Sequence, residues 1–308
     1  MKNIKNILLA CVSLITILTA CTKDEDVKPL PSYADFLSSN PDVSIFNAAL
    51  ERGGLQTYKN GGGPFTFIMP INSAFQSVGI NLDSVNRMTQ GVASYLVTYH
   101  IINARFSTND MIAAYTFPRN TAQLTPIYSG GDESGGFFIN GAKISSANIE
   151  IANGLIHKIA TPLSPVNLIG NIQTILTSTG KHSLFIAALT KANRWALFAT
   201  TTAYTVIAPT DSAMIASGLT SGTIASATMG RVDTIVRYHY FNSLRLFTND
   251  LGNKITPQTA LGVGRTLTAS NNGRALKGRT NAVPINITTA NLLGNNGVVQ
   301  IVDGVLRF

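Results

Sequence analysis

The chain has little cysteine, little tryptophan and little charge. Its 308 residues include two cysteines and one tryptophan, and 12% of them are charged. Two cysteines cannot form the disulfide framework of a small secreted domain. The low charge excludes a long coiled coil rich in Glu and Lys, and an apolar content of 45% excludes an intrinsically disordered chain. Glycine and proline, with 26 and 12 residues, are too few for a collagen-like or linker-type composition.

The N-terminus has the parts of a secretory signal peptide. Lys2 and Lys5 precede an apolar stretch over residues 7–20, which is too short for a membrane-spanning helix of about 20 residues. It ends in Leu18-Thr19-Ala20-Cys21, which resembles the lipobox of bacterial lipoproteins. The resemblance implies that residues 1–20 are removed and that Cys21 becomes the first mature residue, carrying lipid chains of the palmitate type. The alternative is an ordinary signal peptide whose cleavage site happens to precede a cysteine.

Residues 21–32 are predicted to be an acidic, proline-containing tether. Cys21 is followed almost directly by a charged cluster: Lys23, Asp24, Glu25 and Asp26. A cluster at this place resembles the surface-export signal of some Gram-negative lipoproteins. The resemblance implies an outer-membrane lipoprotein exposed on the cell surface. The alternative is a solvated tether on a protein that faces the periplasm. Because Cys11 would leave with the signal peptide, the mature chain would have no free thiol.

The rest of the chain is an internal repeat. At a shift of 139 residues, three blocks coincide: 46–50 with 185–189, 65–74 with 204–213, and 99–100 with 238–239. A fourth block, 153–156, matches 296–299 at a shift of 143. A constant shift followed by a small drift predicts a tandem duplication with one four-residue insertion. We therefore expect two domains of ordinary size, a first repeat over residues 33–166 and a second over residues 167–308.

Each block also predicts a local structure. The apolar spacing over residues 45–50 predicts a helix that ends at Gly53-Gly54, and residues 92–101 predict a second helix. Residues 65–69 and 204–208 alternate as strands, and the proline after each stops it. Asn72 and Asp211 are expected to be N-caps of the helix that follows. Asn153-Gly154 predicts a tight hairpin before an apolar strand.

These blocks resemble the FAS1 (fasciclin) domain, in the order in which that family has them. The matching features are a strand followed by Pro and Asn/Asp-Ser-Ala, a Tyr-His pair, and an Asn-Gly segment that ends in His. The second copy departs from the pattern at Gln300, where the family has His. The resemblance implies an α+β fold, a β-sandwich-like wedge with packed helices. It also implies a role in cell adhesion or in surface and matrix contacts, not catalysis.

The sequence predicts no metal site, no cofactor and no enzymatic activity. There are four histidines, at positions 100, 157, 182 and 239. His100 and His239 are equivalent residues of different repeats, so they are expected to lie far apart. No HExxH or GxSxG motif is present. We therefore expect each histidine to have a structural role.

Two pairs of residues are candidate binding sites by resemblance. In adhesive FAS1 proteins the Tyr-His region is linked to integrin contact, which singles out Tyr99-His100 and Tyr238-His239. The alternative is that these residues pack inside their domains. A second adhesion motif of the family has Asp-Ile, but here the matching residues are Asn148-Ile149 and Asn291-Leu292. Without the carboxylate that would bind an integrin's metal ion, we do not expect integrin-type recognition.

Positive charge is concentrated in the second repeat. Residues 167–308 hold 12 Lys and Arg and four Asp, a net charge of +8, whereas residues 33–166 hold seven basic and eight acidic residues. Arg274, Lys277 and Arg279 lie in a polar stretch that predicts an exposed loop. These charges favour an anionic glycan or a protein as partner. Nucleic acid is not expected, since the basic residues are not interleaved with aromatics. Alternatively, the charge only keeps the domain soluble.

The function that follows is a lipid-anchored adhesion or interaction protein of the cell envelope, which binds a protein or glycan partner through its FAS1 domains. The alternative is a glycan-capture accessory lipoprotein of a nutrient-uptake system. That function calls for exposed aromatic side chains along a groove, and the single Trp195 and scattered tyrosines give it little support.

We expect Cys21→Ala to release the protein from membranes, because the lipid is the insertion device that the sequence indicates. The measurement is the partition between membrane and soluble fractions after a carbonate wash. A variant that stays wholly in the membrane fraction would contradict the lipoprotein interpretation. As a companion, Asp24/Glu25/Asp26→Ala should reduce protease accessibility on intact cells. Unchanged accessibility would remove the export signal.

Overall fold

The computed structural model describes residues 28–111, 118–132, 134–164, 170–252 and 258–308. The predicted signal peptide, Cys21 and the charged cluster at residues 23–26 lie outside the described residues. The compact part begins at Pro31, whose carbonyl oxygen accepts a hydrogen bond from the Ala152 amide (2.9 Å). Among the helices that are described, none combines the length and the apolar character needed to cross a membrane.

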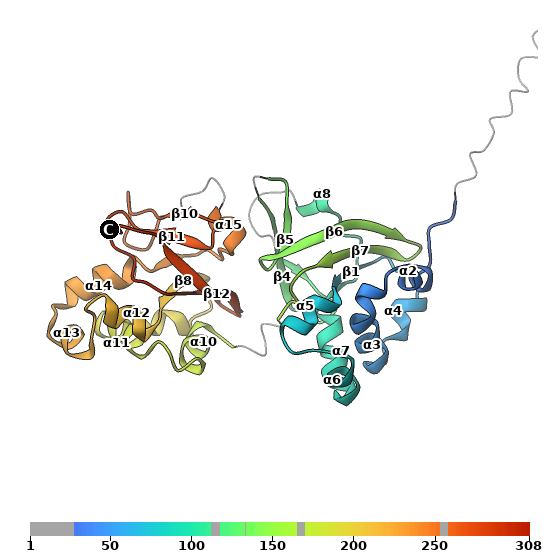
Figure 1. Cartoon of the computed structure of the whole chain (residues 1–308), viewed down its shortest axis with the longest axis horizontal. Helices are drawn as coiled ribbons and strands as arrows, with labels where there is room; N and C mark the ends of the chain where they lie inside the picture. The colour runs from blue at the N-terminus through green and yellow to red at the C-terminus, as the bar shows by residue number, and fades with distance from the viewer. Residues whose placement is uncertain (1–27, 112–117, 133, 165–169, 253–257) are drawn as a thin grey trace, which may run out of the picture. The chain divides into compact units, whose positions relative to one another are not determined.

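The first repeat places a set of helices before most of its strands (Figure 1). Its helices are α2 (Tyr33–Ser39), η1 (Pro41–Val43), α3 (Ser44–Arg52), α4 (Gln56–Asn60), α5 (Asn72–Ser77), α6 (Leu82–Arg87), α7 (Gln90–Thr98) and α8 (Thr108–Met111). Its strands are β1 (Phe65–Pro70), β2 (Ile101–Ile102), β3 (Pro118–Asn120), β4 (Pro126–Gly131), β5 (Phe137–Ile139), β6 (Ala142–Ile151) and β7 (Gly154–Ile159).

The second repeat has the same plan. Its helices are α10 (Ile172–Ser178), α11 (Ser183–Lys191), η2 (Trp195–Ala199), α12 (Asp211–Ala216), α13 (Ser221–Ser226), α14 (Met229–Arg237) and α15 (Thr248–Gly252). Its strands are β8 (Tyr204–Pro209), β9 (Tyr240–Asn242), β10 (Thr268–Ser270), β11 (Ala275–Lys277), β12 (Ile285–Gly294) and β13 (Gly297–Val302). The predicted strands, the hairpin and the helix over residues 45–50 are confirmed. The helix expected over residues 92–101 is also present, but it ends at Thr98, and Ile101 begins β2.

A parallel pair of strands lies inside each sheet, one strand in from an edge. The described strands are ordered β2-β1-β7-β6-β5-β4-β3 in the first repeat and β10-β11-β12-β13-β8-β9 in the second. β1 pairs in parallel with β7, and β8 pairs in parallel with β13 in the same register. All other pairings in the two sheets are antiparallel. Because a parallel pair needs a long crossover, each domain can close only when its last strand arrives beside its first.

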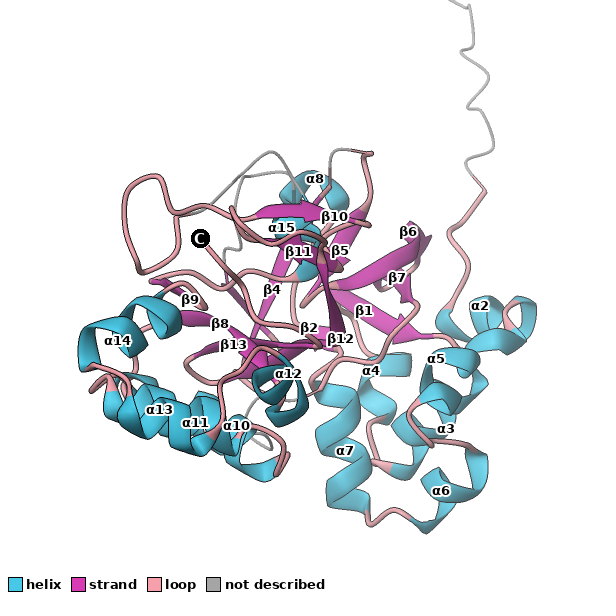
Figure 2. Ribbon diagram, turned by 60° about the vertical axis from the view of Figure 1, so that its left-hand side comes forward, coloured by secondary structure: helices cyan, strands magenta, loops and turns pink. Residues whose placement is uncertain are grey.

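Each central strand is buried on both faces. In β1, Phe67 and Met69 pack with the helices, whereas Ile68 belongs to a cluster formed by the strands themselves, with Ile127 and Ile139 from β4 and β5. The sheet therefore folds over its own strands on one face and is covered by helices on the other. The main group of helices in each repeat lies together beside its sheet (Figure 2). This is the expected α+β wedge.

The two predicted N-caps are wrong in their position. Ile71 and Thr210 are the N-caps of α5 and α12, and Asn72 and Asp211 are the first helical residues. Their side chains reach another helix: the Asn72 Oδ1 accepts from the Ile45 amide (3.0 Å), and the Asp211 Oδ1 accepts from the Leu184 amide (2.8 Å). They satisfy the free amides at the start of α3 and α11. A cap across 27 residues leaves no local sequence signal.

A second long-range contact ties the N-terminal segment to the central sheet. The Lys158 ammonium of β7 donates to Asn40 Oδ1 (2.7 Å) and to both carboxylate oxygens of Asp42 (2.9 and 3.0 Å). Lys158 also lies over the Phe36 ring, 5.6 Å from its centroid. The lysine is 9% exposed, so the pair is screened less than a surface ion pair.

We expect Gly154→Ala to destabilise the first repeat by roughly 2–4 kcal/mol. A Cβ at residue 154 would stand 1.9 Å from the Phe65 carbonyl oxygen, at the first pair of the parallel ladder. The matched control is Gly91→Ala in α7, where a Cβ meets nothing within 4 Å and alanine is the better helix former. The measurement is the melting temperature of both variants. Equal melting temperatures would contradict the close approach.

Candidate functional site

The two Tyr-His pairs lie inside their domains. Tyr99 and Tyr238 are the C-caps of α7 and α14, and His100 and His239 lead into β2 and β9. All four side chains are at most 1% exposed. The Tyr99 hydroxyl donates to the Pro126 carbonyl (3.3 Å) and the Tyr238 hydroxyl to the Thr266 carbonyl (2.9 Å). Of the two alternatives for these pairs, the structure favours internal packing over direct contact with a partner.

His100 and His239 each make two hydrogen bonds to the backbone, which fix the tautomer of the ring. The Nδ1 of His100 lies 2.8 Å from the Leu96 carbonyl oxygen, and its Nε2 accepts from the Leu163 amide (2.9 Å). His239 repeats this arrangement with Ile235 (2.8 Å) and Leu306 (3.0 Å). A carbonyl only accepts, so Nδ1 carries the proton and the ring is neutral. Burial lowers the pKa of both histidines to about 4.

Gln300 reproduces the contacts of the histidine that it replaces. In the first repeat, the Asn148 amide donates to His157 Nδ1 (3.2 Å), and His157 Nε2 donates to the Phe106 carbonyl (2.8 Å). In the second, the Asn291 amide donates to Gln300 Oε1 (2.8 Å), and Gln300 Nε2 donates to the Leu246 carbonyl (3.1 Å). The amide offers one acceptor and one donor where the neutral imidazole does. The departure from the family pattern therefore preserves the structure.

Asn148 and Asn291, at the position of the family's acidic adhesion residue, are also structural. Each has a positive φ (54° and 61°) and lies where the pairing of the last two strands shifts register. The Asn148 Oδ1 accepts from the Thr108 amide (3.0 Å) and its Nδ2 donates to the Thr108 hydroxyl (2.6 Å). Asn291 makes the same pair with Thr248. A carboxylate could not donate the second bond.

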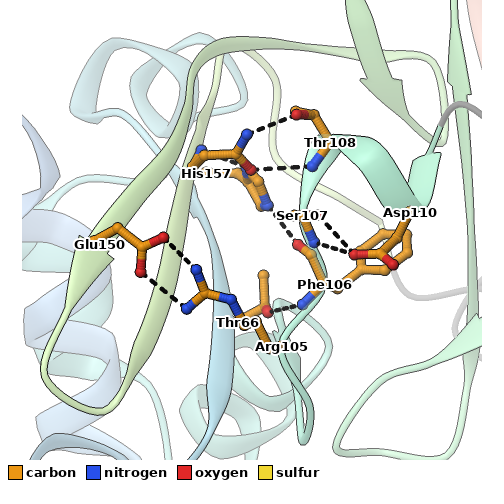
Figure 3. Close-up of polar contacts among 9 residues, drawn as sticks. Thr66, Arg105, Phe106, Ser107, Thr108, Asp110, Glu150 and His157 are labelled. Atoms are coloured by element: carbon orange, nitrogen blue, oxygen red, sulfur yellow. Dashed lines mark hydrogen bonds and ion pairs between the residues drawn. The ribbon is translucent and has the colours of Figure 1, made fainter.

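These residues belong to a polar network that the sequence analysis missed (Figure 3). The Thr66 hydroxyl of β1 donates to the Ala104 carbonyl (2.7 Å) and accepts from the Phe106 amide (2.8 Å). Asp110 accepts from the Ser107 amide (2.7 Å). The signal was present: Thr108-Asn109-Asp110 recurs as Thr248-Asn249-Asp250 at a shift of 140. The network holds the segment before α8 against β1 and β7.

The network ends at the surface in an ion pair. Arg105 Nη1 donates to Glu150 Oε2 (2.9 Å), and Nη2 contacts the other carboxylate oxygen, so the pair is bidentate (Figure 3). The two side chains are 52% and 38% exposed, so solvent screens the pair and it contributes little to stability. Its second-repeat counterpart, Arg245, donates instead to the Asn295 carbonyl (3.0 Å). The ion pair is thus a feature of one repeat only.

The three basic candidates of the second repeat do not share one loop, which corrects that expectation. Arg274 ends the turn between β10 and β11, Lys277 is the last residue of β11, and Arg279 lies in the turn beyond it. Arg274 and Arg279 are exposed and Lys277 is half-buried. The short strand forms because Leu276 is buried in the strand-side cluster. Leu276 is the apolar residue within the polar stretch that signals this strand.

No group of three or more His, Cys, Asp or Glu that could bind a metal occurs among the residues that the structure describes. The fourth histidine, His182, is 1% exposed, and its Nδ1 lies 2.9 Å from the Pro209 carbonyl oxygen. The polar residues that recur in both repeats therefore serve folding.

The comparison with known families agrees with this geometry. The family model described as Fasciclin domain matches residues 41–165 and 180–308. The chain therefore belongs to the Fasciclin domain family, with two copies in tandem, and no enzyme family is indicated.

Several relatives share one or both copies. Stabilin-2 of Rattus norvegicus is 30% identical over 133 residues, covering 43% of this chain and 9% of its own length. Periostin of Homo sapiens is 24% identical over 255 residues, covering 80% of this chain and 28% of its own length. The chain thus spans less than a third of these relatives. A solved FAS1 domain pair from the insect cell adhesion molecule Fasciclin I is 17% identical, with a TM-score of 0.42, and covers 88% of this chain and 98% of that chain.

Because His157 and Gln300 occupy equivalent positions in the two repeats, exchanging them gives a prediction about pH dependence. Burial lowers the pKa of His157 in the folded state, whereas the unfolded chain binds the proton below about pH 6.5. This histidine therefore costs stability as the pH falls below that value. We expect His157→Gln to fold normally at pH 7. Between pH 7 and pH 5 its melting temperature should fall by roughly 2–4 °C less than that of the wild type.

The reciprocal variant is the control. Gln300→His should make the same two hydrogen bonds at pH 7 and lose more stability than the wild type on acidification. The measurement is thermal unfolding of all three proteins at several pH values. Parallel curves for the three would show that the site does not titrate on unfolding.

Proposed function

We propose that this protein is a lipid-anchored adhesion protein of the cell envelope, which binds a protein or glycan partner through the outer surfaces of its two FAS1 domains. The observation that carries the proposal is the family membership of both repeats. The recurring polar residues support it: His100 and His157 are buried, and they and Asn148 make internal hydrogen bonds. Binding, not catalysis, is what remains for such a scaffold. Export and anchoring rest on the sequence around Cys21.

The charge of the second repeat favours an anionic partner. Among its described residues, the carboxylate of Asp233 is paired with Arg194 (2.7 Å) and Arg237 (3.6 Å). The Asp211 carboxylate accepts a hydrogen bond from the Leu184 amide at the start of α11, and the Asp303 carboxylate accepts one from the Asn286 amide (2.7 Å). The remaining described Lys and Arg have no carboxylate within 4.0 Å, so their field extends into solvent. Sulfated or uronic-acid glycans carry the complementary charge.

The glycan-capture alternative needs a platform of exposed aromatic rings, and none is present in the described part of the chain. Trp195 is half-buried against the helical core. Among the described residues, Phe308 is the one aromatic side chain that is exposed, at 38%. The Arg265 guanidinium lies over its ring, with Cζ 5.1 Å from the ring centroid. Nothing in this arrangement favours stacking of a neutral sugar.

We expect Arg274/Lys277/Arg279→Glu in the mature chain to weaken binding to a heparin-like glycan by roughly tenfold at low salt. The reason is that three cations become anions in the basic repeat, and such binding depends on charge. Wild-type binding should fall steeply between low salt and about 0.5 M, since the Debye length shrinks from about 10 Å at 0.1 M. The measurement is calorimetric titration at two salt concentrations, with a neutral glycan beside the charged one.

The control carries the same change in charge on the first repeat: Arg87/Arg119/Lys143→Glu. This variant should retain most of the affinity. Equal losses in the two variants, or binding that does not respond to salt, would reject the second repeat as the anionic glycan site.

A further inference from the structure

The helices of the second repeat enclose a pocket that the recurring polar network does not use. It has a volume of about 320 Å³ and is lined by residues of α11, α12, α13 and α14, whose ribbons are labelled in Figure 1. Large apolar side chains reach it from Met214, Leu219, Ile224, Val232 and Ile235, and Thr223, Ser226 and Arg231 contribute polar groups. Met214, Ile224 and Val232 belong to the buried helical core. A volume of this size is at the lower end of the range for small-molecule sites.

Smaller side chains in the second repeat accompany the hollow: Met214 stands where the first repeat has Phe75, and Ala227 differs still more. Ala227 lines the pocket between α13 and α14, and its equivalent in the first repeat is Met88. The match is secure because Thr228 and Thr89, the next residues, are both helix N-caps. Met88 is half-buried and packs against the helical core of its repeat. Where the first repeat fills the space with a long side chain, the second has a single methyl group.

A further substitution places an unpaired cation at the same pocket. Arg231 lines it from the first turn of α14, where the first repeat has Val92. The Arg231 side chain is exposed, and within the described residues it makes no ion pair or hydrogen bond. The acidic residue nearest along the helix, Asp233, is already held by Arg194 and Arg237. The Lys191 ammonium donates to the Ala225 carbonyl of α13, which adds positive charge to this side of the domain.

The remaining polar groups do not fit a sugar. The Thr223 hydroxyl donates to the Gly218 carbonyl (2.8 Å), and the Ser226 hydroxyl to the Thr223 carbonyl (3.4 Å), so both are engaged within the turn and helix that carry them. No aromatic side chain lines the pocket. Five large apolar side chains beside one free guanidinium are complementary to a molecule with an apolar body and a single negative head.

We propose that this pocket binds a small amphipathic carboxylate, with its hydrocarbon body among the helices and its carboxylate on Arg231. At roughly 30 Å³ for each small group, the pocket holds a ligand of about ten non-hydrogen atoms, the size of octanoate. The site belongs to the second FAS1 domain alone, so the two copies differ in function as well as in charge.

The test is titration of the mature chain with octanoate below its micelle concentration, followed by ¹H–¹⁵N NMR. We expect saturable shifts confined to α11–α14. Butyrate, which lacks most of the hydrocarbon chain, and 1-octanol, which lacks the carboxylate, should each bind at least fivefold more weakly than octanoate. Arg231→Gln should weaken the binding of octanoate at least fivefold. Arg307→Gln, which removes an exposed cation outside the pocket, should change it less than twofold.

The decisive variant is Ala227→Met, which gives the second repeat the side chain of the first. It should fold with an unchanged or raised melting temperature, because Met88 is accommodated at the equivalent place. It should also weaken the binding of octanoate at least tenfold. Octanoate binding that survives in a folded Ala227→Met protein, or the absence of saturable shifts in the wild type, would overturn the proposal. Binding that survives Arg231→Gln unchanged would overturn the role of the carboxylate.

Discussion

The parallel pairing of the first and last strands of each repeat is the constraint on which the rest of the structure depends. β1 and β7 meet so closely that the Phe65 carbonyl leaves no room for a Cβ at residue 154, and Tyr204 imposes the same limit at residue 297. Once the strands are in place, Thr66 on one and His157 on the other face the segment before α8. The polar network is therefore a consequence of the pairing, and it cannot form before the chain has closed.

The network shows how two copies diverge while keeping one fold. His157 and Gln300 differ in chemistry but offer an acceptor and a donor in the same places, so the backbone groups around them remain satisfied. A buried polar group left unpaired costs about 1–3 kcal/mol, which limits what can replace either residue. The surface and the helical layer are under no such limit. There the copies differ freely, in the Arg105–Glu150 pair, in net charge and at Ala227.

Much of the fold could be predicted from the sequence because its signals are local and occur twice. The alternation in residues 65–69, the apolar face of residues 45–50 and the Asn153-Gly154 turn all predicted the right elements. Asn72 and Asp211 were predicted as local caps, since a sequence does not show that a side chain reaches a helix 27 residues earlier. The strand β11 was missed because Leu276 is a lone apolar residue among polar ones. The pocket was missed because Ala227 is an ordinary residue in the sequence, and its small size matters only beside the longer Met88 when the two packed repeats are compared.

The contacts of the N-terminal segment bear on mechanics. If the proposed lipid anchor and partner hold the protein from opposite sides, tension would enter the first domain at Pro31. The load then passes to the hydrogen bond from the Ala152 amide and to the bonds that Lys158 makes with Asn40 and Asp42. Both contacts join the entry segment to the last hairpin of the domain, so the pull is shared with the central sheet and does not unwind α2 alone. The domain is thereby built to resist detachment from the end where it would be anchored.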